Sequence, residues 1–231
     1  MWQLGETELS ALQLSLAVAL RSVAINLLPA VVMAWVLTRR RFPGRTLLDA
    51  VVHLPLVLPP VVVGYVLLLL LGTRGPIGGW LDRQFDVQLV FSTTGAAVAT
   101  AVMSFPLMVR AMRIALENVD RGLEEAARTL GAGPWRRFGT ITLPLMLPGV
   151  LAGAVTAFAA GLGEFGAVIT FVSNIPDETR TLPLALYTAL QSPDGNLVAA
   201  RLATLSFSLG LCGLLASELL ARGLRRWLGS R

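Results

Sequence analysis

Long apolar segments alternate with short charged stretches along the whole chain. Five of them run for about 18 residues or more, and they cover residues 9–37, 54–71, 87–109, 146–172 and 202–221. A helix of that length crosses a hydrocarbon core roughly 30 Å thick, and it satisfies its own backbone hydrogen bonds where lipid offers none. The pattern therefore predicts an all-α membrane protein, a polytopic bundle of about five transmembrane helices.

The composition agrees with this pattern. Of the 231 residues, 55% are hydrophobic and 14% are charged, and the mean hydropathy is +0.69. These values are too apolar for a soluble domain of this length. No internal repeat or low-complexity segment divides the sequence. We therefore expect a single transmembrane domain over residues 1–231, with the first segment kept as a helix.

All nineteen basic residues are arginines, and their positions predict an orientation. Most of them follow the first and third predicted helices or lie in the tail: Arg39, Arg40, Arg41, Arg45, Arg110, Arg113, Arg121, Arg128, Arg136, Arg137, Arg222, Arg225, Arg226 and Arg231. Cytoplasmic loops are enriched in Arg and Lys. We expect a multi-pass membrane protein whose amino terminus lies outside and whose carboxyl terminus lies in the cytoplasm. Nucleic-acid binding is excluded because the arginines flank apolar spans and form no basic soluble face.

Two groups of helix-perturbing or small residues predict features of the bundle. Pro55, Pro59 and Pro60 should kink or break the second helix, since proline removes a donor and clashes with the preceding turn. The break either faces a cavity or is a tolerated kink. Small residues in the fourth segment should let another helix approach closely, in a packed bundle and a dimer. They are Gly149, Gly153, Ala157, Gly161 and Gly163.

Two predicted connections are longer than simple turns. Outside the membrane, residues 181–191 form a short amphipathic stretch opened by Pro183, which could lie in the interface plane. In the cytoplasm, residues 117–148 predict helix, turn, helix. Residues 122–130 are strong helix formers and Gly131 provides a stop. Pro134 then restarts a helix, which Pro144 and Pro148 should break as the chain re-enters the membrane.

The cytoplasmic loop carries a specific resemblance. Glu125, Ala126 and Ala127, followed by Gly131 and then by Ile141, Leu143 and Pro144, are similar to the signature loop of ABC importer permeases. The resemblance implies the type I importer permease fold. It also implies that the loop fits a groove on a cytoplasmic ATPase. The implied coupling surface consists of Glu125, Ala126, Ala127, Arg128, Leu130 and Gly131. An amphipathic surface helix without a partner is the alternative.

Three further segments are similar to molybdate permeases in particular: HLPLVLPPVVVGY (53–65), MSFPLMVR (103–110) and GEFGAVITFVSNIPDETR (163–180). This resemblance implies a permease homodimer in the lipid of a bacterial inner membrane, two cytoplasmic ABC ATPase subunits and an extracytoplasmic oxyanion-binding protein. Tungstate, or sulfate or thiosulfate, is the alternative cargo, and a passive anion channel is the alternative mechanism.

The chain itself lacks the groups for catalysis. A Walker phosphate-binding loop needs a lysine, and the sequence has none, so ATP must bind to a partner subunit and no cofactor is expected here. A membrane enzyme would need paired acid–base groups or a metal cluster. A single His53, a single Cys212 and an isolated Glu164 supply neither.

Glu164 lies inside the fourth apolar segment and is a candidate for function, because charged groups in membranes are costly. It could belong to an outer gate or to an anchoring hydrogen-bond network, or it could reach interfacial water or pair with an arginine. Its negative charge argues against a direct role as an oxyanion ligand. The other candidates for the translocation path or gate are Gly163, Gly166, Pro59, Pro60 and Ser104.

Overall fold

The computed structural model describes residues 5–229, and within that range every regular element is a helix. The elements are α1 (Glu6–Arg39), α2 (Arg45–His53), η1 (Leu54–Leu56), α3 (Pro60–Leu71), α4 (Gly78–Phe85), α5 (Thr93–Glu117), α6 (Arg121–Thr129), α7 (Pro134–Arg137), η2 (Phe138–Thr142), α8 (Leu143–Leu162), α9 (Gly166–Val172), α10 (Leu182–Leu190) and α11 (Asn196–Gly229). The all-α prediction is confirmed.

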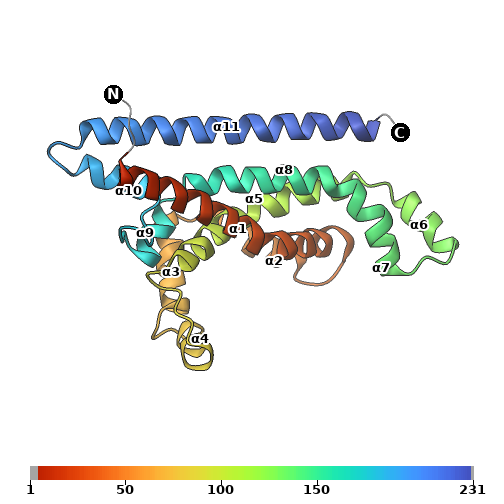
Figure 1. Cartoon of the computed structure of the whole chain (residues 1–231). Helices are drawn as coiled ribbons and strands as arrows, with labels where there is room; N and C mark the ends of the chain where they lie inside the picture. The colour runs from red at the N-terminus through yellow and green to blue at the C-terminus, as the bar shows by residue number, and fades with distance from the viewer. Residues whose placement is uncertain (1–4, 230–231) are drawn as a thin grey trace.

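Four helical segments are long and apolar enough to cross a membrane: Glu6–Arg39, Thr93–Glu117, Pro134–Leu162 and Asn196–Ala216. The bent pair Arg45–Leu56 and Pro60–Leu71 passes the same test of length and hydropathy when its two helices are taken together, and their axes meet at 111°. The four long segments run in a similar direction (Figure 1). The predicted number of about five spans is confirmed when the bent pair is counted as one.

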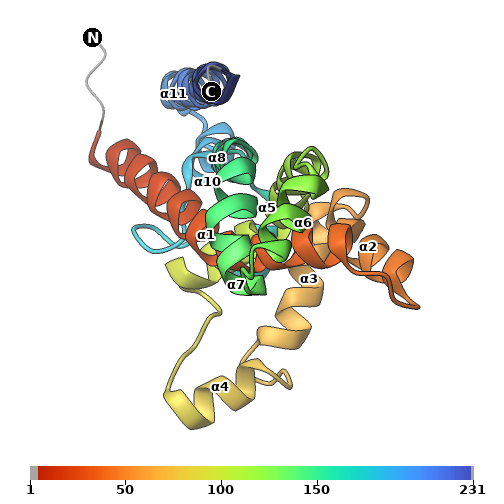
Figure 2. The same cartoon turned by 90° about the vertical axis from the view of Figure 1, so that its right-hand side faces the viewer.

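The connections separate into two ends of the bundle. α6, α7 and the junction of α1 with α2 lie at the same end as the carboxyl terminus, whereas α4, α9, α10 and the start of α1 lie toward the other (Figures 1 and 2). We call the first of these the α6 end. The arginine-rich connections lie at this end, as expected for five spans that cross the membrane in alternating directions.

α5 lies at the centre of the bundle between α1 and α8. The core at the α6 end is built on fully buried side chains from these three helices, among them Leu37, Met108, Met112 and Met146. A Cβ added to Gly153 of α8 would lie 3.2 Å from the Cβ of Ala111 of α5. The small-residue stripe therefore serves packing of α8 on α5 within one chain. The predicted close contact with another helix is confirmed, and the dimer stays a prediction.

The second span breaks where the prolines predicted it. Pro55 lies in the 3-10 turn η1, Pro59 is the residue before α3, and Pro60 is its first residue. The chain turns there because proline cannot donate to the preceding turn. α3 then packs against α9, and Gly64 permits the contact. A Cβ at Gly64 would lie 2.7 Å from the carbonyl oxygen of Ala167.

Two predicted helix boundaries were wrong. α8 ends at Leu162, and residues 166–172 form the separate α9, so the fourth apolar segment is two helices. Pro144 and Pro148 do not end the helix that follows Pro134, because the helical backbone continues through α7, η2 and α8 from Pro134 to Leu162. The segment changes direction between α7 and α8 (Figure 1), where the π-helical turn η2 lies.

α10 coincides with the predicted amphipathic stretch 181–191. Leu182 and Leu184 are buried, and the helix packs against α11 and α1. The backbone amide of Leu182 also donates to Ser15 of α1 at 2.7 Å. This segment is therefore tied to the bundle at the end opposite to α6.

Candidate coupling site

The signature loop folds as a short helix with a defined beginning and end. The carboxylate of Asp120 caps α6 by accepting a hydrogen bond from the amide of Gly122 at 2.8 Å. At the other end Gly131 has a φ of 80°, which favours glycine. The amides of Gly131 and Ala132 donate to the carbonyls of Arg128 (3.0 Å) and Ala127 (2.9 Å). This is the Schellman ending, and the predicted helix and its stop are confirmed.

Glu124 fastens α6 to two membrane helices. One of its oxygens lies 3.2 Å from Nη2 of Arg39, at the end of α1. The same oxygen accepts a hydrogen bond from the hydroxyl of Thr142 at 2.7 Å, at the end of η2. Arg39 also donates to the carbonyl of Leu116 at 3.4 Å. Glu124 was not singled out in the sequence, since its partners lie far along the chain and no local pattern links them.

The signature residues next to Glu124 face outward. Glu125, Ala126, Arg128 and Gly131 are exposed, and Ala127 is half-buried. Leu130 is 87% exposed. An exposed leucine beside small and charged residues provides a surface onto which another subunit can dock.

A charged cleft of about 320 Å³ separates α6 from the helices that it is tied to. Both acids of α6 line it, together with four arginines: Arg39, Arg121, Arg128 and Arg137. The side of α6 that faces this cleft is thus strongly polar, whereas its exposed surface carries the apolar Leu130.

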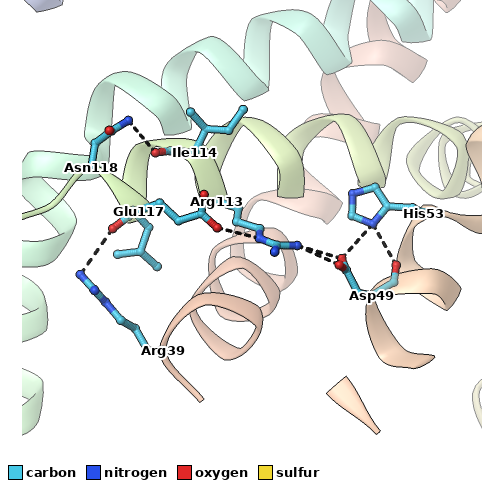
Figure 3. Close-up of polar contacts among 8 residues, drawn as sticks. Arg39, Asp49, His53, Arg113, Ile114, Glu117 and Asn118 are labelled. Atoms are coloured by element: carbon cyan, nitrogen blue, oxygen red, sulfur yellow. Dashed lines mark hydrogen bonds and ion pairs between the residues drawn. The ribbon is translucent and has the colours of Figure 1, made fainter. Parts of the chain in front are cut away.

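A second polar cluster at this end joins α2 to α5 (Figure 3). Nη1 of Arg113 lies 3.0 Å from both oxygens of Asp49, and its Nε lies 3.0 Å from Glu117. Nδ1 of His53 is 3.2 Å from the Asp49 carboxylate. The cluster holds the first half of the broken span against α5. Among residues 5–229, no three metal-binding side chains come together.

The candidate gate residues occupy two separate places. Glu164 lies between α8 and α9, and its carboxylate accepts a hydrogen bond from the amide of Ala167 at 2.9 Å. The pKa of this carboxyl is raised, because burial raises it by more than the hydrogen bonds from backbone amides lower it. Gly166 adjoins α3, since a Cβ there would lie 2.8 Å from that of Pro60. Glu164 was expected within one continuous helix, and it lies instead in the break between α8 and α9.

Ser104 lies in the seam between α1 and α5. It is 2% exposed, donates to the carbonyl of Thr100 at 2.8 Å and accepts from Asn26 at 3.2 Å. Asn26 also donates to the carbonyl of Ala101 at 2.8 Å. Ser104 is therefore part of a buried hydrogen-bond group between two helices, and the structure does not bring it together with Glu164.

The helical bundle has the type I fold of ABC importer permeases. Residues 11–226 match the family described as "Binding-protein-dependent transport system inner membrane component", and the chain belongs to it. It is 59% identical to the molybdenum transport system permease protein ModB of Escherichia coli K12, over 95% of this chain and 96% of that one. Identity to the protein of the same name from Haemophilus influenzae is 53%, over 96% and 97%.

More distant relatives share the fold. The sulfate transport system permease protein CysT of Escherichia coli K12 is 44% identical over 70% of this chain and 58% of its own. A solved bacterial ABC transporter involved in import of the acidic polysaccharide alginate matches with a TM-score of 0.74 and 17% identity. That match covers 95% of this chain and 80% of the other. The predicted fold and family resemblance are confirmed.

Proposed function

We propose that this chain forms the translocation path of an ATP-driven molybdate importer and couples that path to a cytoplasmic ATPase through the Glu125–Gly131 loop. The observation that carries the coupling role is the geometry of α6. Glu124 anchors the helix inward to α1 and η2, while Glu125, Ala126 and Leu130 remain exposed. A helix held on one side and open on the other is suited to receive force from a docked subunit.

The proposed assembly has a permease homodimer, two ATPase subunits and an extracytoplasmic oxyanion-binding protein. ATP binds to the ATPase subunits, and this chain, as one transmembrane domain with no lysine, contributes no phosphate-binding loop. The α6 end faces the cytoplasm in this proposal, and the amino terminus lies outside. The arginines gathered at the α6 end support that orientation.

Molybdate is proposed as cargo because the match to molybdenum permeases runs over nearly the whole length of both chains. The sulfate permease match spans 58% of that relative. Tungstate has nearly the same size and charge as molybdate, so it remains an alternative cargo. The candidate gate around Glu164, Gly163, Gly166, Pro59 and Pro60 belongs to this proposal as the region where α3 meets α9.

The test is ATPase activity of the chain reconstituted with its ATPase and binding protein, with molybdate, tungstate or sulfate supplied. Stimulation by molybdate or tungstate supports the proposal. Stimulation by sulfate alone changes the cargo. Transport that continues without ATP hydrolysis indicates a passive channel and refutes the coupling role.

Gly131 offers a specific perturbation of coupling. Its φ of 80° makes an alanine strained although nothing lies within 4 Å of an added Cβ, and the strain is about 1–2 kcal/mol. Gly131→Ala should therefore loosen the end of α6 and lower molybdate-stimulated ATPase activity. Gly133→Ala is the matched control, because Gly133 has a φ of −66° and equally open space. Equal activity of the two variants would contradict the coupling role of this turn.

A further inference from the structure

An apolar groove of about 490 Å³ lies at the α6 end, between α1 and the start of α7. One wall is the stretch of α1 from Leu28 to Arg40. The facing wall is built by Pro134, Trp135 and Phe138. The groove is distinct from the coupling face of α6 and from the candidate gate, which lies at the other end of the bundle (Figure 1).

The side chains of this groove are large, apolar and uncovered by the chain itself. Leu28 is 72% exposed, Val32 is 51% exposed and Trp135 is 85% exposed. Contiguous exposed surface of this kind marks an interaction site. Two tryptophans, Trp35 and Trp135, line it at the end of a predicted span, where indole rings favour the boundary between acyl chains and headgroups.

A positive charge stands at the mouth of the groove. The guanidinium of Arg40 lies 4.9 Å from the ring centroid of Trp35. No carboxylate forms an ion pair with it in the part of the chain that the structure describes. Three acids of this end have other partners: Glu124 pairs with Arg39, and Asp49 and Glu117 pair with Arg113. An anion from outside the chain is therefore the complementary partner for Arg40.

We propose that the groove binds one anionic phospholipid, with an acyl chain against α1 and the phosphate at Arg40. Basic pockets between helices at the membrane surface suit anionic headgroups, and the apolar walls suit the chain. The lipid would brace Trp135 against Trp35, just after the coupling helix.

The experiment uses the assembled complex in phosphatidylcholine nanodiscs, titrated with phosphatidylglycerol that carries brominated acyl chains. Quenching of tryptophan fluorescence reports binding, and native mass spectrometry counts the retained lipid. Arg40→Gln should weaken phosphatidylglycerol binding about fivefold, the contribution of one arginine near an anionic surface. Arg41→Gln is the matched control, since it removes the same charge from the next residue, which does not line the groove.

A second pair of variants tests the apolar wall. Trp135→Ala should abolish lipid retention, whereas Trp80→Ala, in α4 toward the opposite end, should leave it unchanged. Equal weakening by Arg40→Gln and Arg41→Gln would overturn the proposal, as would equal quenching by brominated phosphatidylcholine. Displacement by soluble glycerol phosphate would indicate a free phosphate ester in place of lipid.

Dissociation of permease subunits in Trp135→Ala with lipid retention unchanged would assign the groove to a second copy of the chain and overturn lipid binding. These readouts measure lipid and not transport. The proposal can therefore fail while the importer function holds, and the reverse is also true.

Discussion

Removing the charge of Glu124 should detach α6 from the membrane helices. One oxygen of this carboxylate lies 3.2 Å from Arg39 and 2.7 Å from the hydroxyl of Thr142. A hydrogen bond to a charged group contributes about 1.5–3 kcal/mol when well buried. The Glu124 side chain is 22% exposed, and Arg39 keeps its contact with the Leu116 carbonyl. We therefore expect Glu124→Gln to cost about 1–2 kcal/mol.

That loss is large enough to change how α6 is held. A difference of 1.4 kcal/mol is a factor of about ten in an equilibrium constant, so the docked fraction of the helix should fall about tenfold relative to the undocked fraction. ATP hydrolysis by the reconstituted complex should continue while the molybdate moved per ATP falls. Denaturant unfolding of the purified chain gives the stability loss. The cycle of Glu124→Gln with Arg39→Gln should return a coupling energy of about 1 kcal/mol.

Glu125→Gln is the matched control, because it makes the same chemical change at the next residue, which is exposed. Its unfolding free energy should stay at the wild-type value while its affinity for the ATPase falls. Equal unfolding free energies of the two glutamine variants would refute the role of Glu124 in holding α6. Simple addition of the effects of Glu124→Gln and Arg39→Gln would refute it too.

Three further variants test the packing of the bundle. Gly64→Ala should destabilise the chain by about 1–3 kcal/mol, because its Cβ would meet the α9 backbone at 2.7 Å. Gly210→Ala has open space inside α11 and should not destabilise the chain in the same unfolding assay, since alanine favours the helix by up to about 1 kcal/mol. Asn26→Ala should cost about 0.6–1.7 kcal/mol through loss of its bond to an α5 carbonyl; an unchanged unfolding midpoint would contradict this. Asp49→Asn should weaken the Arg113 contact by up to about 1 kcal/mol and speed amide exchange in α2, and unaltered exchange there would argue against the link.

Features that depend on local chemistry could be predicted from the sequence. The helix α6 and its end follow from the helix formers ahead of Gly131, and the start of α7 follows from Pro134. The break in the second span follows from Pro55, Pro59 and Pro60. Its angle of 111° could not be predicted, because the packing of α3 on α9 decides it.

Features that depend on distant partners could not be predicted. Glu124 and Glu125 are adjacent acids in one helix, and only the fold shows that Arg39 reaches the first of them. The glycines of α8 predicted a close helix contact correctly but did not identify α5 as the partner. Hydropathy also carried the fourth segment past Leu162, because α9 is as apolar as a membrane span although it is a separate helix.

The seam between α5 and α8 has a mechanical consequence. The Cβ of Ala111 faces the space that Gly153 leaves open. Sliding of α5 along α8 would move this Cβ against neighbouring side chains, so we expect the two helices to move together as one lever. α6 is fastened to α1 through Arg39 and to the start of that lever through Thr142. Displacement of α6 by a few ångströms would thus be carried along the length of α8 to Leu162, where the stiff segment ends and Glu164 begins the turn into α9.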